Sequence, residues 1–146
     1  MSEFTLEFSS PLRASADEVW AHASTIAGVN AELGPWVRMT APRGASLADA
    51  PPGREALRSV LLVLGVVPVD VHHLTIERAL PRGFDEESWS WLQRRWRHER
   101  RVEPRDGGCV VTDRLTVRPR LAAPLARLLV GWVFAWRHRR LRARFG

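Results

Sequence analysis

The residues of this chain that are best suited to chemistry lie in two segments joined by a turn signal. Residues 94–101 read RRWRHERR and residues 109–120 read CVVTDRLTVRPR, with PRDGG at 104–108 between them. If Glu103 lies opposite Gly108 in an antiparallel hairpin, His98 lies directly across from Asp113. A carboxylate beside an imidazole favours its charged form and fixes which ring nitrogen faces a ligand. The pair can therefore act as a general acid or base, or it can brace the sheet, and both roles stay open.

The same register divides the hairpin into an apolar face and a charged face. The face that carries His98 is the more apolar one, and we expect it to look into a cavity; its other opposing pairs are Trp96–Leu115, Arg100–Val111 and Val102–Cys109. The second face should be a solvated ladder in which each ion pair contributes little. That ladder comprises Arg95, Arg97, Glu99, Arg101, Thr112, Arg114, Thr116 and Arg118.

Around this hairpin the sequence predicts strands and helices in a definite order. Residues 4–8 alternate as a half-buried strand does, and Ser15 is placed to cap a helix that follows. A short helical turn is predicted at 28–33 and a strand at 36–42. Residues 41–56 hold three prolines and two glycines without periodicity, so they are either a lid or a solvated excursion. Five strands in series are then predicted, at 57–67, 69–80, 84–93, 94–103 and 109–120.

The chain should end in one long amphipathic helix over residues 124–146. The residues at helical spacing that we expect to face the sheet are Leu125, Leu128, Leu129, Trp132, Val133 and Trp136. Val130 and Phe134 fall off that stripe, which suggests a contact in a homodimer. Five arginines at 137–144 follow, so a contact with an anionic membrane surface is considered as an alternative, and His138 among them is expected at the surface.

This order of elements resembles the START-like (SRPBCC) superfamily, which includes polyketide cyclases and lipid-transfer domains. The resemblance is carried by SASADEVWAHAS, GPWVRMTAP, GGCVVTDRLTVRPR and FAWRHRRLRARFG. It implies an α+β helix-grip fold for residues 1–146 as one ligand-binding domain, with an antiparallel sheet of six to seven strands wrapped around the terminal helix. It also implies a cavity for a small hydrophobic molecule, without a universal catalytic residue.

Composition narrows the functional classes further. The net charge is +6, but all 22 basic residues are Arg and the 16 acidic residues are interleaved with them up to about position 118, which argues against nucleic-acid binding. Cys109 is the single cysteine, so an internal disulfide is excluded and a cytoplasmic location is expected. His72 and His73 are adjacent in a strand and point to opposite faces, so they do not chelate one metal, and we predict neither a metal nor a cofactor.

Three functions are therefore considered. The first is binding of a small hydrophobic, aromatic or lipid-like molecule; the second is a polyketide cyclase or dehydratase reaction with His98 and Asp113 transferring protons; the third is a basic module for nucleic acid or a membrane surface. Whether Trp89 and Trp91 or Ser88 and Ser90 face the cavity is left open. The predicted ligand contacts are Trp36, His72, Trp96, His98, Arg100, Val111, Asp113, Leu115, Leu129 and Val133.

Overall fold

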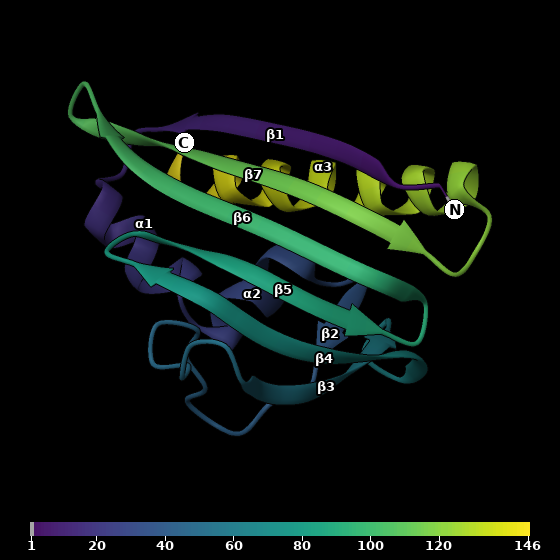
Figure 1. Ribbon diagram of the computed structural model, residues 1–146. Helices are drawn as coiled ribbons and strands as arrows, with labels where there is room; N and C mark the ends of the chain where they lie inside the picture. The colour runs from purple at the N-terminus through teal and green to yellow at the C-terminus, as the bar shows by residue number, and fades with distance from the viewer. Residues whose placement is uncertain (1) are drawn as a thin grey trace.

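A curved antiparallel sheet of seven strands wraps around a long C-terminal helix in the computed structural model, which describes residues 2–146 (Figure 1). The sheet order is β1-β7-β6-β5-β4-β3-β2. The strands are β1 (Phe4–Leu12), β2 (Val37–Met39), β3 (Glu55–Val63), β4 (Val67–Leu80), β5 (Gly83–Ser90), β6 (Gln93–Arg105) and β7 (Gly108–Pro119). The helices are α1 (Ala16–Ala23), α2 (Ile26–Leu33) and α3 (Ala123–Phe145).

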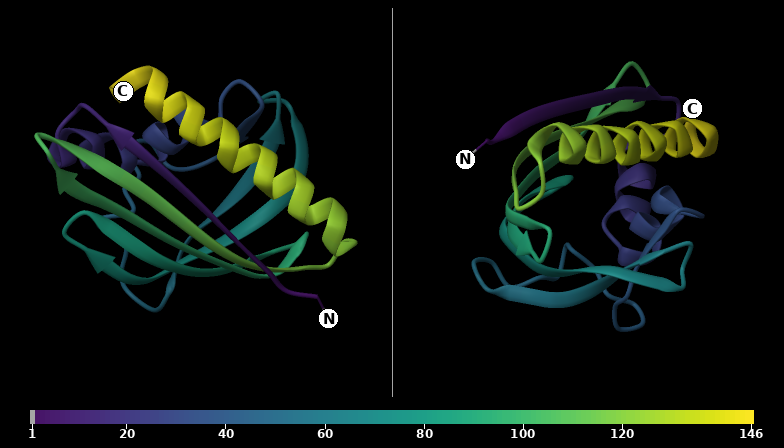
Figure 2. Two further views of the ribbon diagram at one scale, coloured as in Figure 1. Left: turned by 90° about the horizontal axis from the view of Figure 1, so that it is seen from above. Right: turned by 90° about the vertical axis from the view of Figure 1, so that its right-hand side faces the viewer.

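The layers of the fold are set by how far the sheet curls. Helix α3 lies across the concave side, and the two short helices stand between α3 and the far strands of the sheet (Figure 2). The residues that join α3 to β1 and β7 form one core cluster, which contains Phe4, Leu115, Val117, Ala126, Val130 and Phe134. A second cluster lies between α2 and strands β4 and β5. The predicted α+β order, from strand to two helices to strands to long helix, is confirmed.

Side-chain caps fix the starts of the two short helices. The Ser15 hydroxyl accepts a hydrogen bond from the Glu18 amide at 3.2 Å, as predicted, and Thr25 does the same for Gly28 at 3.0 Å. Such caps satisfy amide groups that have no partner inside the helix. They hold α2 in the place where Glu32 and Leu33 point toward the concave side of the sheet.

The predicted register of the β6–β7 hairpin is wrong by two residues. Asp106 and Gly107 both have positive φ, at 48° and 83°, and form a two-residue turn that pairs Arg105 with Gly108. Asp-Gly is the sequence that favours such a turn. His98 therefore lies opposite Leu115, and Arg100 lies opposite Asp113. Because the error is an even number of residues, every side chain keeps its predicted face.

The face of α3 that meets the sheet is also not the predicted one. Leu125, Leu128, Leu129 and Trp132 are exposed, and Leu128 keeps 70% of its surface. The buried residues of α3 are Ala126, Val130, Phe134, Arg137, His138 and Leu141. Val130 and Phe134 are thus core residues and not a dimer contact, and His138 is buried. The sequence pattern did not predict this face because it includes Arg137 and His138. Their side chains are paired with carboxylates from other elements.

Candidate ligand-binding cavity

A cavity of about 200 Å³ lies between the concave side of the sheet and helices α2 and α3. Most of its lining is apolar, and α2, β2, β3, β4, β5, β6 and α3 all contribute. Leu47, in the segment 41–56, also lines it and is buried, with its amide donating to the Ser24 carbonyl at 2.7 Å. That segment therefore forms part of the cavity wall, while opening of it as a lid stays a prediction.

The structure brings half of the predicted contact residues to the cavity. His72, Trp96, His98, Leu129 and Val133 line it. The others lie elsewhere: Trp36 is exposed beside α3, Val111 and Leu115 are in the core, and Arg100 and Asp113 are buried behind His98. The four displaced residues on β6 and β7 share a face with the lining residues, but the helices cover their part of that face.

The polar floor of the cavity is built around Glu86, which the sequence analysis did not single out. Its Oε2 accepts hydrogen bonds from His72 Nε2 at 2.6 Å and from the Ser88 hydroxyl at 2.6 Å. His98 Nδ1 lies 3.7 Å from Oε1 of the same carboxylate. Ser88 and Ser90 face inward, and Trp89 and Trp91 are exposed. That alternation, extended two residues back, would have placed Glu86 inside.

Behind the floor, Asp113 of β7 joins residues from two other elements, β6 and α3. Its Oδ1 lies 2.6 Å from Nε2 of His98 and accepts from Nε of Arg100 at 2.7 Å. Its Oδ2 lies 2.7 Å from Nε2 of His138 on α3. His98 and Asp113 are thus in contact although they are diagonal neighbours in the sheet. The predicted pair exists, but it is one link in a larger buried network.

The network continues to Glu32 on α2. Arg100 donates to both carboxylate oxygens of Glu32, at 2.9 and 2.8 Å, and Nε of Arg137 donates to Oε1 at 3.1 Å. Sequence reasoning missed Glu32 and Arg137 because a charged residue on a helix is normally solvated. Their burial is stable only because each charge has a partner.

The pKa values of these groups follow from burial and pairing. Burial by itself would raise the pKa of Asp113, but the Arg100 guanidinium holds that pKa well below its usual range. The pKa values of Glu32 and Glu86 are lowered in the same way, by Arg100 and by His72 respectively, against the effect of burial. Burial lowers the pKa of Arg137. The three carboxylates are therefore ionised in the folded protein near neutral pH.

Two polar residues of the cavity lining, Gln93 and Arg137, are candidates for contact with a ligand. Gln93 is 9% exposed and lines the cavity, and its Oε1 is fully buried with no hydrogen-bond partner in residues 2–146. Arg137 also lines the cavity, with its guanidinium carbon 4.7 Å from the centre of the Phe134 ring. A buried carbonyl without a partner is rare in folded proteins, and it marks a place where a ligand can donate.

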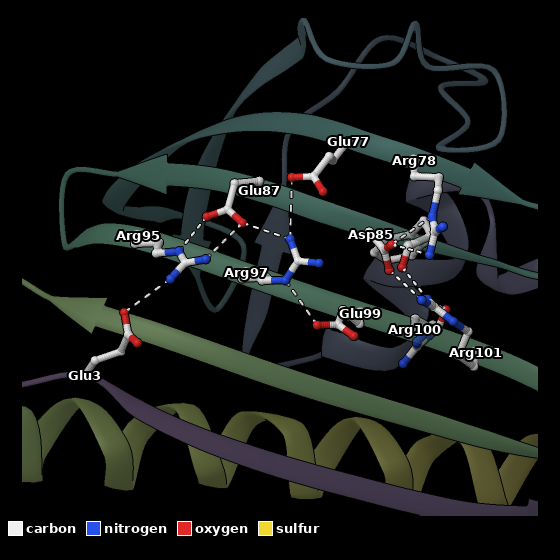
Figure 3. A network of polar contacts seen from close by, with 11 residues as sticks. Glu3, Glu77, Arg78, Asp85, Glu87, Arg95, Arg97, Glu99, Arg100 and Arg101 are labelled. Atoms are coloured by element: carbon white, nitrogen blue, oxygen red, sulfur yellow. Dashed lines mark hydrogen bonds and ion pairs between the residues drawn. The ribbon is translucent and has the colours of Figure 1, made fainter.

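The arginines on the outer face of β6 are already engaged with carboxylates (Figure 3). Arg95 and Arg97 both bind Glu87, at 2.6 and 3.0 Å, and Arg101 binds Asp85 at 2.6 Å. The charged outer face is as predicted, but the carboxylates that pair with these arginines come from β5 and not from β7, the strand to which the predicted ladder was assigned. The lone cysteine, Cys109, is a buried core residue, and burial raises the pKa of its thiol. Among residues 2–146, no three His, Cys, Asp or Glu side chains are grouped to hold a metal ion.

A helix gripped by a curved antiparallel sheet, with an apolar cavity between them, is the START-like helix-grip fold, and solved structures share it. A START superfamily protein from Mycobacterium smegmatis has a TM-score of 0.70 and 14% identity, covering 97% of this chain and 96% of that one. A protein from Chromobacterium violaceum has a TM-score of 0.71 and 12% identity, covering 95% of each chain. The Zhui aromatase/cyclase from Streptomyces sp. R1128 has a TM-score of 0.66 and 11% identity, covering 98% and 93%.

The chain belongs to the family described as Domain of unknown function (DUF8410), which matches residues 10–145. The search of curated proteins found no match to this chain. The predicted START-like fold is confirmed, and at these identities the solved structures show the fold alone. In residues 2–146 no helix is both long and apolar enough to cross a membrane.

Proposed function

We propose that this protein binds a small, mainly apolar molecule, aromatic or lipid-like, that carries a hydrogen-bond donor such as a hydroxyl group. The observation that carries the proposal is an apolar cavity of about 200 Å³ lined in part by Gln93, a residue whose buried Oε1 has no hydrogen-bond partner within residues 2–146. An apolar cavity of about 150 Å³ is enough to hold benzene. The available space therefore suits a molecule of one or two rings, or a short chain.

The lining favours an aromatic body for this ligand. Trp96 and Phe134 have ring centres 6.0 Å apart, and the Phe84 and Phe134 rings both meet His98 at nearly right angles. Aromatic rings packed in this way are stabilised by more than the burial of their surface area alone. A hydroxyl group on the ring, directed toward β6, would satisfy the Gln93 carbonyl, which otherwise costs about 1–3 kcal/mol to leave unpaired.

The enzymatic alternative, in which His98 and Asp113 transfer protons, has weaker support. Nε2 of His98 is bound to Asp113, and Asp113 itself does not line the cavity. Removing a proton from His98 would disturb a carboxylate that also serves Arg100 and His138. The pair is therefore better suited to bracing the sheet, which is the other role that the sequence left open. The third function, binding of nucleic acid through RRWRHERR, competes with ion pairs already made by Arg95, Arg97 and Arg101.

A calorimetric titration with two probes tests the proposal. We expect 2-naphthol to bind, and naphthalene, which lacks the hydroxyl group, to bind about tenfold more weakly, a difference of about 1.4 kcal/mol. In the Gln93→Leu variant that preference should disappear, because the acceptor is gone. Val133→Trp should abolish binding of both probes by filling the cavity.

The matched control is Leu128→Trp, which places the same side chain on α3 outside the cavity. It should leave both affinities unchanged. Failure of both probes to bind the wild-type protein would contradict the proposed function. If the two probes bind equally and Gln93→Leu changes neither affinity, the claim that the ligand carries a hydrogen-bond donor is contradicted. The claim that the cavity binds an apolar molecule would still hold.

A further inference from the structure

A band of exposed apolar side chains borders the cavity. Helix α3 contributes Leu129, which is 50% exposed although it also lines the cavity, together with Leu125, Leu128 and Trp132. Further exposed apolar residues come from the turn between β3 and β4 and from Trp36. We call this set the apolar rim: Trp36, Val63, Leu64, Val66, Val67, Leu125, Leu128, Leu129 and Trp132.

Contacts across Trp36 make the rim continuous. The Trp36 and Trp132 rings meet edge to face with centres 5.6 Å apart. On its other side, the Trp36 carbonyl accepts a hydrogen bond from the Leu64 amide at 2.8 Å. Leu64 and Gly65 both have positive φ, 53° and 74°, so the chain reverses tightly there and presents the side chains around it outward. One surface thus runs from α3 to the β3–β4 turn.

The charge around the rim has one sign. Residues 120–146 contain seven arginines and no acidic residue; Arg137 is buried against Glu32, while Arg127 is exposed between Leu125 and Leu128. Arg38 follows Trp36 by two positions and is exposed, and Arg139 lies with its guanidinium carbon 5.9 Å from the centre of the Trp136 ring. Elsewhere, as on the outer face of β6, arginines alternate with carboxylates.

We propose that the apolar rim docks on the surface of an anionic lipid bilayer. Burial of exposed tryptophan and leucine side chains at the boundary between headgroups and acyl chains lowers the free energy. Flanking arginines add electrostatic attraction to anionic headgroups. A second copy of this chain fits the rim less well, because pairing like surfaces would bring arginines together with no acidic partner. Since Leu129 belongs both to the rim and to the cavity lining, an apolar ligand could pass between bilayer and cavity without crossing water.

Vesicle binding by the full-length chain tests this docking. Flotation is measured with vesicles containing 30 mol% phosphatidylglycerol in phosphatidylcholine and with vesicles of phosphatidylcholine alone, both in about 0.1 M salt. We expect binding to the anionic vesicles at least tenfold tighter than to the neutral ones. Leu128→Glu and Leu64→Asp, on the two separate parts of the rim, should each weaken binding at least tenfold. Aspartate tolerates the positive φ of position 64, and circular dichroism checks that both variants are folded.

A pair of charge reversals supplies the matched control. Arg127 lies beside the rim, and Arg105 is the last residue of β6, next to the β6–β7 turn at the opposite end of the molecule from the start of α3 (Figure 1); each is changed to Glu. Both change the net charge by the same amount, and we expect Arg127→Glu to weaken vesicle binding at least fivefold more. Equal losses would mean that only net charge attracts the protein, and would overturn the proposal.

Two other results would also overturn it. One is absence of wild-type binding to the anionic vesicles; the other is a dimer in sedimentation velocity that Leu128→Glu converts to a monomer, which would assign the rim to a second copy. The test is independent of the cavity, since Val133→Trp should lose 2-naphthol binding and keep vesicle binding. Failure of the proposed ligand site and failure of membrane docking are therefore distinguishable.

Discussion

Glu32 on α2 is the residue that best shows how this protein tolerates charge in its interior. It is 2% exposed, and two guanidinium groups, those of Arg100 and Arg137, bind its carboxylate. Removing one partner of a buried ion pair leaves the other charge uncompensated, which typically costs about 3–5 kcal/mol. The residue therefore connects α2, β6 and α3 through charge and not through apolar contact.

We predict that Glu32→Gln lowers the free energy of unfolding by about 3 kcal/mol at pH 7, measured by urea denaturation. Because the pKa of Glu32 is lowered in the folded state, its contribution is complete above the unfolded pKa of about 4.5 and is lost as the pH falls through the lower folded value. The difference between variant and wild type should therefore shrink below about pH 4.5.

The control is Glu87→Gln, the same substitution in the outer ladder, where we expect less than about 1 kcal/mol at pH 7. Glu87 pairs with Arg95 and Arg97 in contact with solvent. A cost for Glu32→Gln no larger than that for Glu87→Gln, or a difference that stays constant down to pH 3, would contradict the role assigned to the buried network.

At the scale of the element, α3 is a helix whose most hydrophobic face is not its buried face. Its buried side carries Arg137 and His138, and its outer side carries Leu128 and Trp132. Periodicity predicted the helix and its extent correctly, because the spacing of apolar residues does not depend on where the partners lie. It could not predict the orientation, since that depends on Glu32 and Asp113, which are remote in the sequence.

Two identical substitutions on α3 test this orientation. Leu141→Ala should lower the free energy of unfolding by about 2–5 kcal/mol, because Leu141 is 1% exposed and packs in the core. Leu128→Ala should change it by less than about 0.5 kcal/mol, because Leu128 is exposed. Thermal or urea unfolding of both variants measures the difference, and the reverse order would mean that the predicted stripe is the buried one.

The hairpin of β6 and β7 shows a different limit of sequence reasoning. Alternation assigned the inner and outer faces correctly, and the Asp106–Gly107 turn could have fixed the register, since Asp-Gly is the pair that favours a two-residue turn. Centring the turn one residue too early placed His98 directly opposite Asp113. The two side chains still meet, with Nε2 and Oδ1 2.6 Å apart, because long side chains reach a diagonal neighbour.

At the scale of the whole molecule, the fold could be predicted from the order of elements, while the cavity could be predicted only in part. Trp96, His98 and His72 were found because strand alternation is local. Glu86, Gln93 and Arg137 were missed because the curl of the sheet and the position of α3 decide which part of the inner face stays open. The cavity is therefore a property of the assembled layers, and its polar groups follow from the tertiary structure.

The most direct test of the central claim is to map where 2-naphthol binds, by following the ¹H–¹⁵N correlation spectrum of the labelled protein during a titration. The account predicts saturable shifts for the side-chain amide of Gln93, the indole of Trp96 and backbone amides of α2 and α3 that face the cavity, with little change at Trp89 and Trp91 on the outer surface. Saturable shifts confined to Trp89, Trp91 and the outer face of β6, with Gln93 and Trp96 unmoved, would contradict it.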